Sequence, residues 1–357
     1  MGVVISNPIV PILSNFLFEI NGNKLTVTAS DLHTTISSEI EINSNDKFDI
    51  TVPAKILLET LKNLFDQPIQ FIVDTKSFSI ELISDNGKYK ITGESAADFP
   101  KTAVLKNTDL VEISTDTFKH AIKNTLFATS TDELRPAMTG VLMEVSKKKI
   151  TFAATDGHRL IRYDRLDVSN KSNANLIIPR KTLTILNAIL PTQNGDLAID
   201  LNETNASFKF GNTVLISRLI EEKFPAYQNV IPETNSADMT ISRLDLVSTL
   251  KRLSIYANKN THMVIFNITN NELNVKGEDL DYSNEANETL ACEYAGEEFV
   301  IGFNAKFLLE VLVNLNAEQV HFKLIGANRA VVIVSTEKSE QEDMLSLVMP
   351  IMIPVYA

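Results

Sequence analysis

The sequence predicts an α+β protein built from three tandem copies of one domain, each with antiparallel sheets and two helices. Two kinds of landmark repeat with a period of about 124 residues, which is the mark of internal duplication. A strand ending in aspartate recurs at Asp31, Asp156 and Asp279. The junction between an apolar strand and the helix that follows it recurs at Pro53, Pro179 and Phe303. At 357 residues, the chain has room for three domains of ordinary size.

Within each copy, short strands with alternating apolar residues are interleaved with helical stretches. The first helix of the second copy opens at the capping cluster Ser114-Thr-Asp116, and its counterpart in the third copy runs from about Ser242 to Tyr256. The second helices are expected over residues 54–65, 180–190 and 304–315. The first copy has too few residues ahead of its first strand for the first helix. We therefore expect an N-terminally incomplete first domain that lacks a strand and most of a helix.

Phe-Pro turns close the first two copies, at Phe99-Pro100 and Phe224-Pro225. They predict domain boundaries near residues 107 and 232. The expected domains, called repeats 1, 2 and 3 below, are therefore residues 1–107, 108–232 and 233–357.

Composition limits the class of protein and its compartment. Hydrophobic residues make up 44% and charged residues 22%, which is ordinary for a folded protein. The single cysteine, Cys292, excludes an internal disulfide and a cysteine-based zinc site and suits a reducing compartment. No apolar run approaches the ~20 residues of a membrane span. We expect a cytoplasmic protein with no membrane segment, metal or cofactor.

The helices carry cations despite a net charge of −12, which by itself argues against a nucleic-acid partner. A solvated face would explain the cations of any one helix. Their recurrence on five helices favours a shared cationic surface that attracts phosphate. The residues are Lys55, Lys62, Lys119, Lys123, Arg180, Lys181, Lys251, Arg252 and Lys306.

Residues 150–162 are predicted to form a β-hairpin that turns at Asp156-Gly157. Repeats 1 and 3 keep the aspartate but not the Gly-His-Arg-Leu that follows it. A surface that differs between otherwise equivalent domains is a candidate binding site. His158 beside Asp156 also suggests acid–base catalysis, but the five histidines of the chain show no ligand spacing and no phosphate-binding loop is present.

Four motifs carry a family resemblance: Ala-Thr-Asp-Gly-His-Arg-Leu at 154–160, Arg-Pro-Ala-Met-Thr-Gly at 135–140, Phe-Pro-Ala-Tyr at 224–227 and Val-Met-Pro-Ile at 348–351. With the threefold repeat, they make the sequence resemble the bacterial DNA polymerase III beta subunits, the sliding clamps of DNA replication. The resemblance implies a non-catalytic, DNA-binding processivity factor. It also implies a homodimeric head-to-tail ring of DNA-clamp domains, with sheets outside and helices inside.

Simple geometry agrees with a dimer. Twelve helices, each ~10 Å wide, fit a circle about 38 Å across and leave roughly 28 Å clear, whereas one chain alone would leave about 9 Å. A DNA duplex needs roughly 20 Å. The helix cations would then face double-stranded DNA without reading its sequence.

The resemblance also implies a pocket between domains 2 and 3 for short apolar peptide motifs of the DNA polymerase III catalytic subunit, the clamp loader and repair polymerases. Carried over motif by motif, it comprises Met138, Thr155, Gly157, His158, Arg159, Leu160, Pro225, Val230, Leu347, Met349, Pro350 and Ile351. Core packing would equally explain each apolar member. The implied dimer interface pairs domain 1 with the partner's domain 3, with Tyr89, Ile91, Ile255 and Tyr256 as candidates.

Two other readings stay open. A repeat-built hydrolase or nucleotide-binding enzyme would use Asp156 and His158, and replacing His158 would abolish turnover. A monomeric scaffold of three domains would follow if the first helix is absent from repeat 1.

Overall fold

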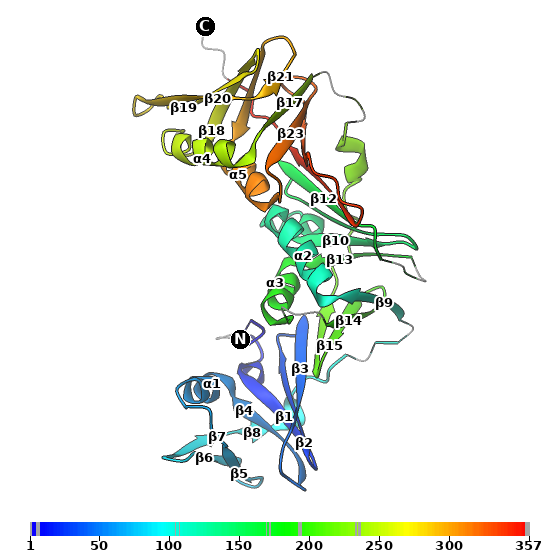
Figure 1. The fold of residues 1–357 in the computed structure, drawn as a ribbon. Helices are drawn as coiled ribbons and strands as arrows, with labels where there is room; N and C mark the ends of the chain where they lie inside the picture. The colour runs from blue at the N-terminus through cyan, green and yellow to red at the C-terminus, as the bar shows by residue number, and fades with distance from the viewer. Residues whose placement is uncertain are drawn as a thin grey trace. The chain divides into compact units, whose positions relative to one another are not determined.

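The computed structural model describes residues 2–4, 8–103, 105–106, 108–168, 170, 173–191, 195–232, 234 and 237–353. The expected boundary residue Asn107 lies outside them. The chain forms two compact units (Figure 1). Unit 1 comprises Met1–Asp116 and Ala188–Leu219, and unit 2 comprises Thr117–Asn187 and Ile220–Ala357. Every strand pairing among the described residues is antiparallel, as the sequence predicted.

Five helices occur among the described residues, at the expected places. They are α1 (Ala54–Lys62), α2 (Thr115–Thr125), α3 (Arg180–Ile189), α4 (Arg243–Leu253) and α5 (Ala305–Asn314). Repeats 2 and 3 have two each. In repeat 1 the described residues ahead of the first strand form only the short 3₁₀ turn η1 (Pro11–Ser14), so the expected lack of a first helix holds there.

Two details of the helix prediction were wrong. Helix α1 ends at Lys62 rather than residue 65. The Asn63 side chain donates to the Glu59 carbonyl at 2.7 Å, and so occupies the acceptor that the Asn63 backbone amide would use if the helix continued. The residue just before the helix is Pro53, Pro179 or Asn304 in the three repeats, so the junction lies one residue later in repeat 3 than expected. Strand pairing confirms this register, because Asn15, Gly140 and Met263 lie opposite these three residues.

Unit 1 is organised by a nine-stranded sheet in the order β8-β4-β1-β2-β3-β16-β15-β14-β9. The junction between β3 and β16 pairs Thr34 with Ser217, so this sheet runs from repeat 1 into repeat 2. The strands are β8 (Glu94–Ser95), β4 (Lys47–Pro53), β1 (Asn15–Asn21), β2 (Lys24–Ser30), β3 (Thr34–Glu41), β16 (Thr213–Arg218), β15 (Asn205–Phe210), β14 (Asp196–Leu201) and β9 (Asp109–Ser114).

A second sheet in unit 1 has three strands, β5 (Gln70–Asp74), β6 (Ser79–Ile83) and β7 (Lys88–Thr92), with β7 at its edge. Leu57 of α1 packs in one core with side chains of both sheets, among them Phe18, Ile50 and Ile80. Ile91 belongs to this core and is 7% exposed. Its assignment to the dimer interface was therefore wrong, because its side chain faces inward from the edge strand.

Unit 2 repeats the plan with a sheet in the order β13-β10-β11-β12-β25-β24-β23-β17-β21 and a four-stranded sheet in the order β20-β19-β18-β22. The junction of β12 with β25 joins repeat 2 to repeat 3. The strands are β13 (Ala174–Pro179), β10 (Gly140–Val145), β11 (Ile150–Thr155), β12 (Arg159–Arg165), β25 (Glu342–Val348), β24 (Val331–Ser335), β23 (Gln319–Leu324), β17 (Ala237–Ser242), β21 (Glu293–Tyr294), β20 (Asn284–Ala291), β19 (Glu272–Asp279), β18 (Met263–Thr269) and β22 (Phe299–Asn304).

The same inter-repeat joint therefore occurs twice. The last strand of a first meander (β3 or β12) pairs with the last strand of the next repeat's second meander (β16 or β25). The equivalent strand of the first meander in repeat 3 is β20, and that of the second meander in repeat 1 is β7. Both lie at sheet edges. Because strand pairing crosses the repeats, the compact units do not coincide with them. Among the described residues, no helix has both the length and the apolar character needed to cross a membrane.

Candidate functional site

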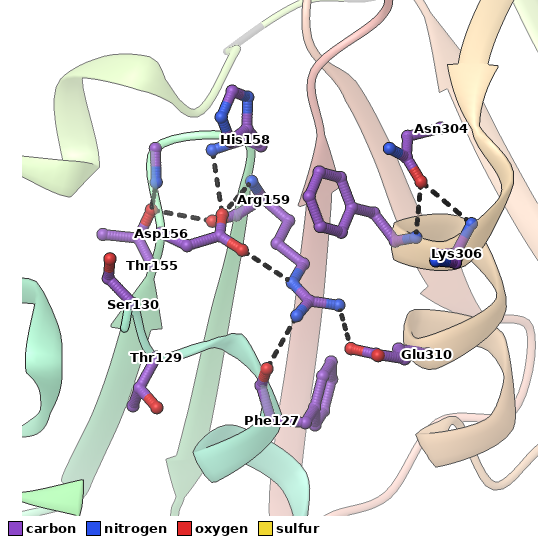
Figure 2. A network of polar contacts seen from close by, with 12 residues as sticks. Phe127, Thr129, Ser130, Thr155, Asp156, His158, Arg159, Asn304, Lys306 and Glu310 are labelled. Atoms are coloured by element: carbon purple, nitrogen blue, oxygen red, sulfur yellow. Dashed lines mark hydrogen bonds and ion pairs between the residues drawn. The ribbon is translucent and has the colours of Figure 1, made fainter. Parts of the chain in front are cut away.

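The tip of the β11–β12 hairpin is held by the side chains of Thr155 and Asp156 (Figure 2). Asp156 Oδ1 accepts the amides of His158 and Arg159 at 2.9 and 3.0 Å. Thr155 Oγ1 accepts the Gly157 amide at 3.1 Å and donates to the Arg159 carbonyl at 2.7 Å. Gly157 has φ of +89°, which glycine adopts without steric cost. The predicted turn is confirmed, and its aspartate serves as a backbone cap.

The same cap explains why the aspartate recurs. In repeat 1, Asp31 Oδ1 accepts the amides of His33 and Thr34 at 2.9 and 2.6 Å. In repeat 3, Asp279 Oδ1 accepts the Asp281 amide at 3.2 Å. His33 stands where repeat 2 has His158, so the histidine is less distinctive than the sequence comparison suggested. An aspartate that caps its own turn in all three repeats has a folding role, which weakens the enzyme reading.

One face of the β12–β25 joint carries the apolar residues of the expected pocket. Leu160 lies opposite both Thr155 and Leu347, so these three side chains share a face. Leu160 and Leu347 are each 2% exposed and pack with Phe224 and Tyr227. Within the chain they are core residues, and they can form only the floor of a pocket.

The exposed members surround this floor. Val230, in the 3₁₀ turn η5 (Tyr227–Val230), is 54% exposed, and Met349 is 39% exposed. Gly157 and His158 are also exposed, whereas Met138, Pro225, Pro350 and Ile351 are half-buried. The structure thus places the predicted residues on the 3₁₀ turn η4 (Pro136–Thr139) ahead of β10, hairpin β11–β12, the segment after β16, and the end of β25 with the segment that follows it, all within unit 2.

The segment after β25 is tied at two points. The Met349 amide donates to the His158 carbonyl at 2.8 Å, and the Ile351 amide donates to the Gly302 carbonyl at 2.8 Å. Gly302 allows this crossing, because a Cβ there would lie 2.7 Å from the Ile351 oxygen. The sequence prediction missed Gly302. Its signal was visible, because Thr51 and Ile177 occupy the equivalent places beside Pro53 and Pro179.

Arg159 differs from the rest of the predicted set, because its side chain is buried on the other face of the sheet. It lies opposite Val348, next to the Leu160–Leu347 pair, and alternate residues of a strand face opposite sides. Its guanidinium donates to Asp156, to the Phe127 carbonyl and to Glu310 of α5 (Figure 2). Its assignment as a direct peptide contact therefore does not fit the structure.

Two further residues that the prediction omitted adjoin the tip. Phe307 of α5 stacks on the His158 ring with the ring centres 5.6 Å apart and the planes 17° from parallel. A Cβ on Gly157 would lie 3.2 Å from Arg135 Nη1, so Arg135 borders the turn. Arg135 opens the Arg-Pro-Ala-Met-Thr-Gly motif that precedes the hairpin within repeat 2, a signal that was available in the sequence. Phe307 had none, because it is one apolar residue of a helix.

The expected DNA-facing cations all lie on helices. Lys119 is half-buried and the others are exposed. Arg252 forms an ion pair with Glu288 of β20, with Nε to Oε1 at 2.7 Å, which raises its pKa. Its charge is directed to a neighbouring strand, so it is a poor candidate for phosphate. The cations are Lys55 and Lys62 on α1, Lys119 and Lys123 on α2, Arg180 and Lys181 on α3, Lys251 and Arg252 on α4, and Lys306 on α5.

The other interface candidates are accessible. Tyr89 on the edge strand β7 is 37% exposed, and Ile255 and Tyr256, just after α4, are 75% and 42% exposed. No group of three or more His, Cys, Asp or Glu side chains suited to a metal ion occurs in the described part of the chain.

Comparison with known proteins gives a consistent picture. Models of the N-terminal, central and C-terminal domains of the DNA polymerase III beta subunit match residues 1–103, 112–226 and 228–352. The beta sliding clamp of Synechocystis sp. is 30% identical over 92% of this chain and 90% of its own length.

Two crystal structures are similar over the whole chain, both of DnaN sliding clamps bound to griselimycin. The Pseudomonas aeruginosa structure has a TM-score of 0.93 and 27% identity, and the match covers 99% of this chain and 95% of that one. The Bartonella birtlesii structure has a TM-score of 0.91 and 30% identity, covering 98% and 94%.

Proposed function

This chain belongs to the DNA polymerase III beta subunit family, the bacterial sliding clamps, and we infer its function from that membership. It is a non-catalytic processivity factor that encircles duplex DNA and tethers the replicative polymerase. We propose further that two copies close head to tail into a cytoplasmic ring. The ring would have its helix cations towards the DNA and an apolar peptide pocket on the β12–β25 joint.

The twice-repeated strand joint carries the ring proposal. Among the described strands, β3 pairs with β16 and β12 pairs with β25. The equivalent strands β20 and β7 pair with no described strand of another repeat. An exposed edge strand presents unpaired backbone groups that another strand can satisfy. Pairing β7 of one copy with β20 of a second copy would repeat the intrachain joint and close the ring.

The two edges also have complementary charges. β7 carries exposed Lys88 and Lys90, and β20 carries exposed Glu285 and half-buried Glu288, of which Glu288 is already paired with Arg252 within the chain. Opposite charges across paired strands stabilise the pairing and suppress the pairing of like edges. Tyr89, Ile255 and Tyr256 would add apolar contact at this interface.

Sequence-independent DNA binding would rest on the helix cations. Lysine and arginine neutralise phosphates without reading bases, and salt screens this attraction over ~8 Å. Such weak, diffuse contacts permit sliding, and the closed ring would prevent loss of the clamp. Exposed candidates occur on all five helices, among them Lys55 on α1, Lys123 on α2, Lys181 on α3, Lys251 on α4 and Lys306 on α5.

Partner binding would use the apolar face around Leu160 and Leu347. A buried floor rimmed by exposed Met349 and Val230 suits short apolar peptides, since methionine repacks around different ligands. The expected ligands are motifs of the polymerase catalytic subunit, the clamp loader and repair polymerases. Griselimycin is bound by the two related clamps. We propose that it binds this chain on the same apolar face, which would make it a probe of the site.

Light scattering across a dilution series tests the ring. A species near twice the 39.7 kDa of one chain is expected, and a persistent monomer would rule the ring out. A charge exchange then tests the interface. Lys88→Glu with Lys90→Glu in one chain, and Glu285→Lys in another, should each weaken homodimers, while their mixture should dimerise.

Two measurements test the remaining functions. Protein bound to circular duplex should be released when a restriction enzyme linearises the DNA, and retention on linear DNA would argue for affinity rather than topology. Titration with fluorescently labelled griselimycin should show saturable binding that Met349→Ala weakens. If wild-type protein fails to bind griselimycin, the pocket proposal falls while the ring proposal stands.

A further inference from the structure

We propose that Arg159 is a positioning residue of the partner site, and that it fastens the hairpin tip of repeat 2 to helix α5 of repeat 3 from behind the pocket. The inference rests on the proposed function of the β12–β25 joint as a peptide site. It assigns Arg159 and Glu310 a role that requires no contact with the ligand.

Strand register separates Arg159 from the pocket. Leu160 and Leu347 form one cross-strand pair, and Arg159 and Val348 form the next. Because side chains alternate along a strand, the second pair faces away from the first. Arg159 accordingly meets Phe127, which follows α2, and Glu310 of α5, whereas Leu160 meets Phe224 and Tyr227.

The guanidinium is held on every side. Nε donates to Asp156 Oδ2 at 3.1 Å, Nη2 to the Phe127 carbonyl at 2.7 Å, and Nη1 to Glu310 Oε2. The rings of Phe127 and Phe307 lie 5.3 and 4.9 Å from Cζ. Arg159 is only 6% exposed. The planar fork of arginine can satisfy three acceptors in different directions while stacking on two rings, which a lysine ammonium cannot do.

These contacts fix the part of the tip that borders the pocket. Asp156 caps the amides of His158 and Arg159 and also accepts from the Arg159 side chain. His158 in turn holds the Met349 amide through its carbonyl and stacks on Phe307. A shift of Arg159 would therefore be transmitted through Asp156 and His158 to Met349.

Repeat 1 shows what the tip is like without this fastening. Thr34 stands at the position of Arg159, and the aspartate cap is the same. The backbone tie is also the same, because the Arg218 amide donates to the His33 carbonyl at 2.8 Å. The fold of the tip thus needs no arginine. Arg159 is an addition specific to the repeat that carries the proposed pocket.

A double-mutant cycle on the full-length protein tests the proposal with labelled griselimycin as the probe. Arg159→Lys should weaken binding by about tenfold and Glu310→Ala by about fivefold, because both loosen a pre-formed site. The double variant should bind about as well as Arg159→Lys alone, because the two residues act through one contact. Glu59→Ala is the matched control, since Ala-Lys-Ile-Leu-Leu-Glu59 of α1 corresponds to Ala-Lys-Phe-Leu-Leu-Glu310 of α5.

Unchanged binding by Glu310→Ala, or additive effects in the cycle, would overturn the proposal in favour of direct contact by Arg159. Hydrogen exchange without ligand supplies a readout that does not depend on the pocket. Both variants should speed exchange of the His158 and Met349 amides, and Glu59→Ala should not. If griselimycin fails to bind even wild-type protein, the peptide site is wrong, and unchanged exchange would show separately that the fastening is wrong.

Discussion

Replacing Gly302 with alanine should weaken peptide binding while leaving the fold nearly as stable as before. The added Cβ would lie 2.7 Å from the Ile351 carbonyl oxygen and 3.2 Å from Ile353 Cγ1. Real Cβ atoms do not approach a backbone oxygen so closely, so either strand β22 or the segment after β25 must move. Which of them moves decides what the experiment detects.

The magnitudes favour movement of the segment. Forcing the methyl group into the packed sheet would cost about 1–3 kcal/mol. Lifting the segment loses the hydrogen bond from Ile351 to Gly302, which is worth about 0.5–1.5 kcal/mol. Removing glycine from the unfolded chain offsets about 0.4–1 kcal/mol of that loss. The melting temperature should therefore fall by less than about 2 °C.

Binding should be affected more, because the ligand must return the segment carrying Met349 to its place against the added strain. A strain above about 1 kcal/mol corresponds to a loss of at least about fivefold in affinity. Griselimycin titration and thermal unfolding of the same sample measure both quantities. Gly326→Ala is the control, because the nearest atom to its Cβ would be Arg329 Cγ at an ordinary 3.6 Å.

A large fall in melting temperature with unchanged affinity would refute the reasoning, because it would mean that the sheet takes up the strain. Unchanged values of both would show that the contact is relieved elsewhere at no cost. Protection of the Ile351 amide from hydrogen exchange distinguishes these cases, since only detachment of the segment exposes it.

Three further predictions concern the fold around the site. Gly140→Ala should lower stability by about 1–3 kcal/mol in thermal unfolding, because its Cβ would lie 2.5 Å from the Ile178 oxygen with side chains packed behind; a neutral result would mean that β10 can shift. Asp156→Ala should destabilise the chain by about 1 kcal/mol more than Asp156→Asn, which keeps an acceptor for both capped amides; equal unfolding midpoints would deny the cap its role. Arg165 lowers the pKa of Asp167, so this carboxylate stabilises the fold above its unfolded pKa and the effect disappears as pH falls through the lower folded value. Asp167→Asn should therefore lower the melting temperature at pH 7, and the difference should shrink as the pH is lowered below the unfolded pKa of the carboxyl group; a pH-independent difference would contradict this assignment.

The helices and the threefold repeat could be predicted from sequence because both depend on local pattern. Capping residues and apolar spacing locate α2, and the recurring aspartate marks a turn that each repeat must cap. The end of α1 was misplaced by three residues, because a single side-chain bond from Asn63 decides it. Such competition between a side chain and the backbone leaves no periodic signal.

The joints between repeats could not be predicted, because strand partners far apart in sequence depend on long-range register. It could be partly predicted that the Arg159 side chain lies on the opposite face of the sheet from the Leu160 side chain. Leu160 follows Arg159 directly in a strand, so the two side chains cannot line one face. Which face holds the pocket is set only when β12 meets β25. The burial of Ile91 similarly depends on β7 facing the core of both sheets in unit 1.

The candidate site coincides with the place where the internal repetition breaks down. The tips of repeats 1 and 2 share an aspartate cap and a backbone tie to the strand that pairs with them. They differ where Leu32, at a φ of +75°, is replaced by Gly157, and where Thr34 is replaced by Arg159. The strand beside each tip also continues differently, since β16 leads to the Phe224-Pro225 turn and β25 leads to Met349 and the crossing over Gly302. The shared features suffice to fold the tip, so the differences can serve binding. They lie around one apolar floor or, in the case of Arg159, directly behind it.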